Sequence, residues 1–370
     1  MKSYVYIKLL KKVDQTIFCV DKNRDQKKYF DSIHGISVPY SSGQQVKRSV
    51  VDKFMEVLDQ ERAKVVMNYA FSGEGKIEQR ETTELTDPRY ADQLIAGWMR
   101  TPSDTTKDDD EGQVSYKRRS PLSISLMNPL HPKLVSMNKE LVTFNRNGIF
   151  NDDLTIRKVK KNGKKEKTVE KWENDEIDEI LKEKNELISK NKFIGPQTLV
   201  SGLFIVNMVI DIESLFTVPI TLSDKQIPSE KEKELIDEGW EVIKFRGGKH
   251  IKLPFNKIEE YTNALVDGLI NWRISSNQSR TYDPMPIISI AVSDVGHENG
   301  YAIRSKLVQE NGKILAKPVI EEGNENTKVY TTPIAGEIFL EDEINIDFKA
   351  IDKAKADIKQ KIMNYYKNLK

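Results

Sequence analysis

The chain has 370 residues, of which 38% are hydrophobic and 31% are charged. This length is enough for one large domain with insertions or for two ordinary domains, and the high charged fraction indicates long polar loops or arms. The 58 basic and 57 acidic residues leave a formal net charge of +1. Overall charge therefore does not indicate a nucleic-acid partner, and any basic surface must come from local segregation of the cations.

Cysteine usage and hydropathy exclude several further classes. The single cysteine, Cys19, rules out an internal disulfide framework and a cysteine-rich zinc site. The N-terminal segment becomes charged too soon for a signal peptide, and no apolar run approaches the length of a membrane span. We therefore expect a soluble, cytoplasmic protein.

The first elements follow the order strand, helix, strand. Residues 4–10 are rich in valine, isoleucine and tyrosine and predict a first strand, which residues 16–20 continue or pair with. A polar loop covers residues 21–39, a helix extends to about residue 60, and the apolar run 63–71 predicts a second strand. This order is typical of a ferredoxin-like or RRM fold.

The start of that helix carries the most informative pattern in the chain. Ser41 or Ser42 is placed to cap the first amides, and Gln45, Lys47 and Arg48 lie near the first turn. Exposed helix-start amides beside two cations can hold a phosphate chain, because arginine forks onto its oxygens and lysine acts as a point charge. The alternative is an ordinary capped helix whose basic end is solvated.

The segment that follows is polar. Residues 76–117 predict a surface excursion or a partly disordered arm, with a short helix near residues 90–99. The basic run Lys117, Arg118 and Arg119 then suits contact with an RNA backbone, while a basic loop over a strand is an equal alternative.

A charged hairpin within residues 153–172 is the strongest local structural signal. Asn162 and Gly163 predict a two-residue turn, because both accept positive φ, and this register places Ile156 opposite Val169. The ribbon has too little apolar surface to form a core, so we expect it to project from the body. Its candidates for RNA contact are Arg157, Lys158 and Lys160.

The second half of the chain alternates helices with buried strands. A charge-laced helix is expected over residues 173–192, a buried strand over 203–210, an amphipathic helix over 258–272 and a strand over 287–292. The polar loop between the last two elements contains Asn277, Gln278 and Arg280.

Two charged segments near these elements each allow two interpretations: the acids after the strand 203–210 and the lysine-rich helix at the C-terminal end of the sequence. Asp211 and Glu213 follow a buried strand, where paired carboxylates invite a catalytic reading but acids at a helix start are the simpler account. Strand candidates cover residues 328–334 and 336–340. The lysine-rich helix over residues 347–369 is either a docking element or a solvated terminal helix.

The chemistry needed for catalysis is missing from the sequence. The four histidines are scattered, and none has a partner at metal-ligand spacing. No nucleophile–base motif and no P-loop occurs. We therefore expect a binding protein that uses no cofactor and no metal.

Several of these residues together resemble a known family. Asn23-Arg24-Asp25 after a first strand, Gly35, Ser41-Ser42 and Gln45-Val46-Lys47-Arg48 are similar to the backbone subunit of the CRISPR-associated Cascade complex. This is the Cas family numbered seven, in the RAMP superfamily. Gly43 and Gln44 inside the serine-to-glutamine interval depart from the family pattern and shift its register by one residue.

The resemblance implies a fold and a set of RNA contacts. It implies an α+β fold with an RRM/ferredoxin-like central domain over residues 1–75 and 201–370, a finger-like insertion over 76–140 and a thumb-like hairpin insertion over 141–200. The residues that we expect to bind RNA are Asn23, Arg24, Ser42, Gln45, Lys47, Arg48, Lys117, Arg118, Arg119, Arg157, Lys158, Lys160, Asn277, Gln278 and Arg280.

The resemblance also implies partners. Several copies would line up along one guide RNA (crRNA) and contact neighbouring copies and other Cascade subunits, while target DNA pairs with the guide and no membrane is involved. Two alternatives stay open. One is an RNA-cleaving RAMP subunit of a type III complex, with a metal held at Asp25 or Asp31; the other is an RRM-like RNA-binding protein unrelated to CRISPR.

Overall fold

A computed structural model describes residues 2–21, 25–71, 77–100, 115–144, 155–157, 169–171, 179, 182–183, 192–245, 247–274, 282–338 and 345–369. The chain divides into two compact units, one formed by residues 1–138 with 199–370 and the other by residues 139–198. In the described part of the chain, no helix has both the length and the apolar character needed to cross a lipid bilayer.

A largely antiparallel sheet forms the centre of the first unit. Its strands follow the order β10-β13-β1-β17-β20, and β8 and β9 also pair with β13. Strand β1 pairs antiparallel with β13 and β17, which places Ile7 opposite Met208 and Val292. The bounds are β1 (Tyr4–Thr16), β8 (Leu122–Ile124), β9 (Asn128–Pro129), β10 (Val135–Phe144), β13 (Lys192–Asp211), β17 (Ile287–Ser293) and β20 (Thr327–Thr331).

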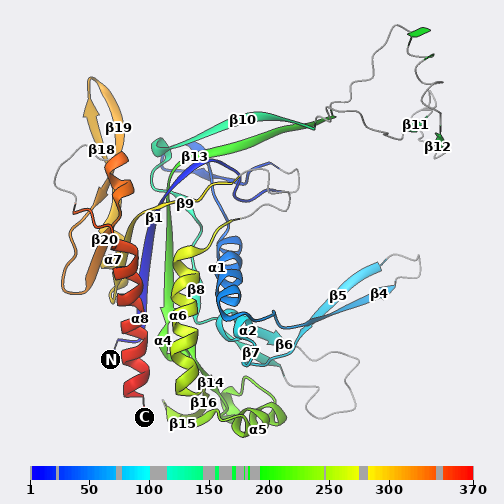
Figure 1. Ribbon diagram of the computed structural model, residues 1–370, viewed down its shortest axis with the longest axis vertical. Coiled ribbons are helices and arrows are strands. Elements are labelled where there is room, and N and C mark those ends of the chain that lie inside the picture. The colour runs from blue at the N-terminus through cyan, green and yellow to red at the C-terminus, as the bar shows by residue number, and fades with distance from the viewer. Residues whose placement is uncertain are drawn as a thin grey trace. The chain divides into compact units, whose positions relative to one another are not determined.

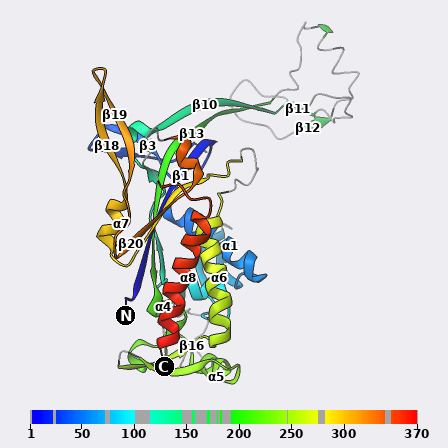
Figure 2. The ribbon, with the colours of Figure 1, turned by 60° about the vertical axis from the view of Figure 1, so that its left-hand side comes forward.

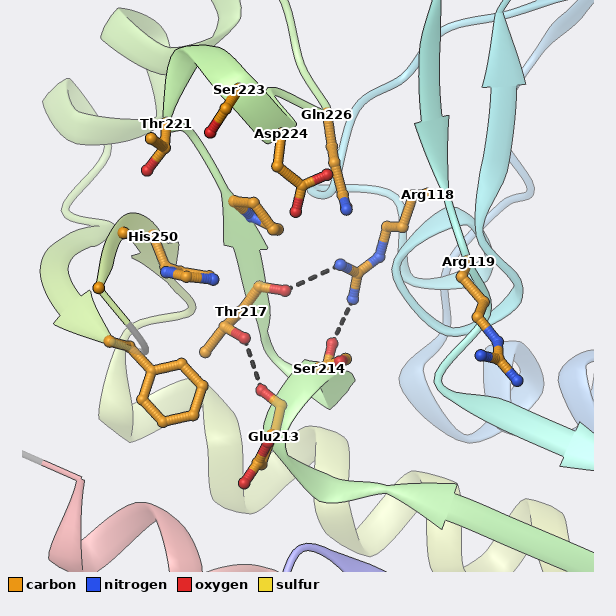
Figure 3. A pocket seen from close by; sticks show the side chains of 14 residues that line it. Arg118, Arg119, Glu213, Ser214, Thr217, Thr221, Ser223, Asp224, Gln226 and His250 are labelled. Carbon is orange, nitrogen blue, oxygen red and sulfur yellow. Dashed lines mark hydrogen bonds between the residues drawn. The ribbon is translucent and has the colours of Figure 1, made fainter.

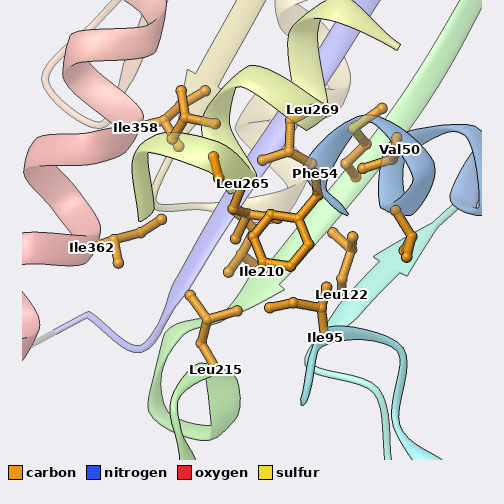
Figure 4. Packing of buried hydrophobic residues seen from close by; sticks show 14 of the residues in the cluster. Val50, Phe54, Ile95, Leu122, Ile210, Leu215, Leu265, Leu269, Ile358 and Ile362 are labelled. Atoms are coloured by element: carbon orange, nitrogen blue, oxygen red, sulfur yellow. The ribbon is translucent and has the colours of Figure 1, made fainter. Parts of the chain in front are cut away.

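Three long helices cover one face of this sheet: α1 (Gly43–Leu58), α6 (Phe255–Asn271) and α8 (Ala350–Asn368) (Figures 1 and 2). Because alternate residues of a strand face opposite sides, Ile7 and Leu9 of β1 pack in the main core beneath the helices, whereas Leu10 joins a smaller cluster on the other face. The main core is drawn from all three helices and the sheet, as Figure 4 shows for Phe54, Leu265, Ile358 and Ile210.

Helices α1 and α6 run antiparallel and approach closely. The side chain of Gln60, just after α1, donates to the hydroxyl of Tyr261 near the start of α6 at 3.2 Å. Further along, a Cβ at Gly268 would lie 2.9 Å from the carbonyl oxygen of Val50. The first turn of α1 and the end of α6 therefore lie at the same end of the helical layer (Figure 1).

The C-terminal helix packs into the core. The two interpretations from the sequence, a docking element and a solvated terminal helix, are therefore both incomplete. Ala354, Ile358 and Ile362 recur every four residues on one face and are fully buried. On its other sides, Lys355 pairs with Asp267 at 2.7 Å and Lys361 with Asp294 at 2.9 Å. The lysines dominate the composition, but the buried stripe decides where the helix lies.

Five of the predicted elements are confirmed, and one predicted strand pairs with a different partner from the expected one. The predicted helices 42–60 and 258–272 and the strands over 4–10, 203–210 and 287–292 are confirmed. The run 63–71 does form a strand, β4 (Val65–Phe71), but it pairs with β5 (Ile77–Glu84) in a separate two-stranded sheet.

The place in the central sheet that we expected for that strand is taken by β8 and β9, from the stretch expected to be a finger-like insertion. Strand propensity is local, whereas the choice of pairing partner is not. Other boundaries differ as well. Residues 17–19 form no strand, and Gly336 lies in a 3-10 helix, η4 (Pro333–Glu337), where Pro333 ends the ladder of β20.

The charged hairpin has a different register from the expected one. Strand β11 (Thr155–Arg157) pairs antiparallel with β12 (Val169–Lys171), which puts Ile156 opposite Glu170 instead of Val169. The expected pairing of Ile156 with Val169 is therefore wrong by one residue, and the Asn162-Gly163 turn lies outside the described residues. The helix expected over 173–192 lies almost wholly outside the described residues.

The remaining described elements are short. Asp211 caps α4 and accepts a hydrogen bond from the Ser214 amide, which confirms the simpler account of the acids after β13. The remaining bounds are β2 (Lys28–Asp31), β3 (Ile36–Pro39), α2 (Ala91–Ala96), β6 (Trp98–Arg100), β7 (Tyr116–Arg118), η2 (Pro132–Leu134), α4 (Ile212–Leu215), β14 (Thr217–Pro219), η3 (Leu222–Asp224), α5 (Ser229–Asp237), β15 (Glu241–Phe245), β16 (Gly248–Lys252), α7 (Gly296–Ala302), β18 (Ile303–Glu310) and β19 (Lys313–Ile320).

Candidate nucleic-acid interface

The start of α1 is a capped helix terminus, as the sequence predicted. Ser42 is the capping residue: its backbone is extended and its Oγ accepts a hydrogen bond from the Gln45 amide at 3.2 Å. Ser41, the other candidate, is buried and bridges to Met127 instead. The capping side chain satisfies one of the first amides, which leaves the positive end of the helix dipole beside Gln45, Lys47 and Arg48.

The two cations of this turn have different surroundings. Lys47 is half-buried, and its ammonium donates to Ser120 Oγ at 2.6 Å. Burial lowers the pKa of Lys47, and among the described residues no carboxylate lies within 4.0 Å of its ammonium. The Arg48 side chain is 72% exposed, with only a loose ion pair to Asp52 at 3.7 Å. An anion placed here would find one partly desolvated and one exposed positive charge.

The basic run at residues 117–119 divides by strand alternation. Lys117 and Arg119 are exposed, but Arg118 shares the inward face of β7 with Tyr116 and is buried. The Arg118 guanidinium donates to the backbone carbonyls of Leu94, Ser214 and Thr217. Most of its donors therefore bind the protein's own backbone, and contact between Arg118 and RNA stays a prediction.

Ser120 joins this run to the helix. Its Oγ lies 2.8 Å from the carbonyl oxygen of Ile95 and accepts a hydrogen bond from the Lys47 ammonium at 2.6 Å. Lys47 is thus held next to the residue that follows Arg119, although the two cations are separated by about seventy positions in sequence. The structure brings the first turn of α1 and the basic run together.

Other expected site residues lie outside the described part of the chain. This holds for Asn23, Arg24, Lys158, Lys160, Asn277, Gln278 and Arg280, while for Arg157 only the backbone is described.

The described residues that flank two of these segments are tied to the same end of the sheet. Beside residues 22–24, the side chain of Gln26 accepts from the Phe18 amide at 3.0 Å and donates to the Tyr40 carbonyl at 2.9 Å, just before α1. Beside residues 275–281, the carboxylate of Asp283 accepts from the amide of Asp14 at 2.7 Å. The described residues that flank both segments therefore lie at the end of β1, near the start of α1.

A buried lysine, which the sequence did not reveal, supports this end. Lys11 is 2% exposed; its ammonium lies 4.4 Å from the centre of the Trp272 ring and donates to the Met285 carbonyl at 3.1 Å. Burial lowers the pKa of Lys11 to about 8, although Asp283 acts in the opposite direction. Alternation along β1 placed residue 11 on the buried face, but the sequence pattern does not identify which polar groups meet it.

The pKa of Lys11 predicts that stability rises with pH. The unfolded chain holds this proton up to a pKa of roughly 10.4, whereas the folded chain releases it at about 8, so the unfolded state binds more protons between these values. Between pH 7.5 and pH 10 we expect Lys11 to add about 2 kcal/mol to the free energy of unfolding. Urea denaturation of wild type and Lys11→Met at both pH values measures this difference. Equal pH dependence of the two proteins would contradict it.

The carboxylates named in the cleavage alternative lie in and before the β2–β3 hairpin. Asp31 accepts from the amides of Ile33 at 2.9 Å and His34 at 3.0 Å, and the His34 ring nitrogen lies 3.2 Å away. The hydrogen bond from the His34 amide contributes most to lowering the pKa of Asp31. Asp25 lies 3.5 Å from the ammonium of Lys28. Within the described ranges, no three His, Cys, Asp or Glu side chains are grouped as metal ligands would be.

Comparisons with known proteins give similarity to solved structures alone. No protein-family model matches the sequence, and no curated protein matches it. One similar structure is a chain of a "CRISPR RNA-guided surveillance complex, pre-nicking", with a TM-score of 0.42 and 8% identity over 98% of this chain and 89% of that chain. Another is a chain of a "CRISPR RNA-guided surveillance complex", with a TM-score of 0.41 and 10% identity over 98% of this chain and 99% of that chain.

Proposed function

We propose that this chain is the guide-RNA-binding backbone subunit of a type I CRISPR Cascade complex. The observation that carries the proposal is the start of α1. There the residues of the family-like motif, Ser42, Gln45, Lys47 and Arg48, surround a capped helix terminus, and Lys47 is desolvated without a nearby carboxylate among the described residues. Such a terminus suits a phosphate of a nucleic-acid backbone.

The topology supports an RRM/ferredoxin-like core for this proposal. Strands β17, β1, β13 and β8 are neighbours in that order, α1 follows β1, and α6 follows β13. A β-α-β-β-α-β unit has the same succession of elements. In this reading, segments outside the unit supply finger-like and thumb-like insertions.

The mode of action follows from the kind of contact available. Phosphate contacts position a strand without reading its bases, so guide sequence is read by pairing with target DNA. Several copies would bind along one crRNA, in contact with neighbouring copies and with other Cascade subunits, in the cytoplasm. In this proposal the subunit binds RNA and does not cleave it.

Replacing both Lys47 and Arg48 with glutamine is expected to weaken RNA binding about tenfold, because two charge-assisted phosphate contacts are lost. Each lost contact should also reduce the log–log salt slope by about 0.7. Fluorescence anisotropy with two single-stranded RNAs of unrelated sequence, each measured across a salt series, tests this. Wild type should bind both RNAs equally well.

The matched control removes two exposed lysines from the β18–β19 hairpin, Lys306→Gln with Lys313→Gln, and changes net charge by the same amount. It should bind RNA like wild type. Salt-independent binding by wild type would contradict the proposal, as would wild-type affinity in a folded Lys47→Gln, Arg48→Gln protein.

A further inference from the structure

The first unit contains a polar pocket that the proposed function does not use. It has a volume of about 360 Å³ and lies between η3, β14, the β15–β16 hairpin and the residues that follow β7 (Figure 3). The side chains of Gln226 and Arg118 both line it. A space of this size holds one small planar molecule or the base of a nucleotide.

The charges around the pocket offset one another. Among the described residues that line it, Arg118 and Arg119 contribute two positive charges, and Glu213 and Asp224 contribute two negative ones. A phosphate would meet as much repulsion as attraction here. The balance favours a ligand that is neutral and carries both hydrogen-bond donors and acceptors.

Two polar groups at the pocket have bonding capacity left. The Gln226 amide oxygen is buried and has no hydrogen-bond partner within the described part of the chain. Arg118 uses one Nη1 hydrogen for the Thr217 carbonyl, and the rest of its bonds run from Nε and Nη2, so one of its five N–H groups is left over. A buried acceptor without a partner costs free energy, and a bound donor removes that cost.

Aromatic and hydroxyl groups complete the wall. The rings of Phe245 and His250 meet edge to face with centroids 5.5 Å apart and both line the pocket. The hairpin turn between them approaches Thr221 closely, since a Cβ at Gly248 would lie 2.8 Å from its Oγ1. Flat aromatic faces beside an amide are the groups that proteins use to hold an unstacked base.

We propose that this pocket binds a nucleobase. An N–H group of the base would donate to Gln226 Oε1, a ring nitrogen or carbonyl would accept from Arg118, and the ring would lie against Phe245. The base can belong to a free nucleotide or to an unstacked residue of a single strand; the chemistry is shared. The lining residues of this site do not include those at the start of α1, and base binding does not depend on the proposed guide binding.

Calorimetric titration of the full chain with AMP, CMP, GMP and UMP, and with ribose 5-phosphate, tests the proposal. At least one mononucleotide is expected to bind with a stoichiometry of one, and ribose 5-phosphate is expected not to bind. Gln226→Leu should weaken that nucleotide about tenfold, the scale of an amide–base contact. Gln309→Leu makes the same change at an exposed position of β18 and should leave binding unchanged.

A second measurement uses only the wild-type protein, so it tests the site even if Gln226→Leu fails to fold. Wild type irradiated with the azido form of the bound nucleotide should be labelled within residues 118–119, 213–226 or 245–250. Labelling confined to other segments would overturn the site, as would mononucleotides that bind no better than ribose 5-phosphate. Competition by a six-residue oligoribonucleotide would assign the base to a strand, and its failure to compete would assign it to a free nucleotide. The Lys47→Gln, Arg48→Gln protein should keep this site, so the two proposals fail separately.

Discussion

Replacing Arg118 with leucine is expected to lower the free energy of unfolding by about 3 kcal/mol. The guanidinium donates to the carbonyls of Leu94, Ser214 and Thr217, which belong to α2, α4 and the start of β14. Leucine fills part of the volume but removes the donor that Arg118 supplies to these carbonyls. Each such loss costs roughly 1–3 kcal/mol, and the recovered desolvation cost of the cation offsets part of the sum.

The neighbouring residue supplies the matched control. Arg119 is exposed, so Arg119→Leu should change the free energy of unfolding by less than about 0.5 kcal/mol. Chemical denaturation of both variants, with the slope of the transition checked for constancy, measures the difference. Equal effects of the two substitutions would show that the Arg118 bonds contribute nothing to stability.

Replacing Gly268 with alanine is expected to destabilise the protein by about 2 kcal/mol, although alanine favours a helix. The new Cβ would lie 2.9 Å from the Val50 carbonyl oxygen and 3.3 Å from Phe54, so α1 and α6 must move apart. Backbone atoms at the contact cannot rotate away as a flexible side chain would. Overpacking of this kind typically costs about 1–3 kcal/mol.

A glycine with free space around its Cβ position, in another helix, tests whether the same substitution stabilises where no close contact exists. A Cβ at Gly300 in α7 would meet nothing within 4 Å, so Gly300→Ala should stabilise by about 0.5–1 kcal/mol. Thermal unfolding of the two single variants compares the same chemical change in both settings. A shift of the same sign in both would contradict the close contact between α1 and α6.

The helices show how far local pattern reaches. Val46, Val50 and Phe54 recur at helical spacing and form the buried face of α1, and the apolar spacing from Ile258 to Trp272 gives the buried face of α6 in the same way. The C-terminal helix shows the same apolar spacing, but its many lysines led us to include a solvated helix among the two interpretations. Periodicity was the better guide there, because a lysine can pair at the surface while the opposite face packs.

The candidate interface was predicted in part. The cap at Ser42 and the nearby cations follow from local chemistry, since a helix start needs an acceptor for its first amides. The burial of Arg118 could have been found from alternation with Tyr116 in β7. The contact between Lys47 and Ser120, and the place of Lys11 beneath Trp272, join residues far apart in sequence and had no local signal.

By itself, the sequence determined the type of α1, α6, β1, β13 and β17 and the buried faces of α1 and α6, because helix and strand periods are properties of neighbouring residues. It also determined the capped basic start of α1. Only the tertiary structure decided that β8 and β9, and not β4, pair in the central sheet, and that Gln226, Arg118 and Phe245 surround one pocket. Strand pairing and side-chain convergence depend on contacts between distant segments, which form only when the whole core is packed.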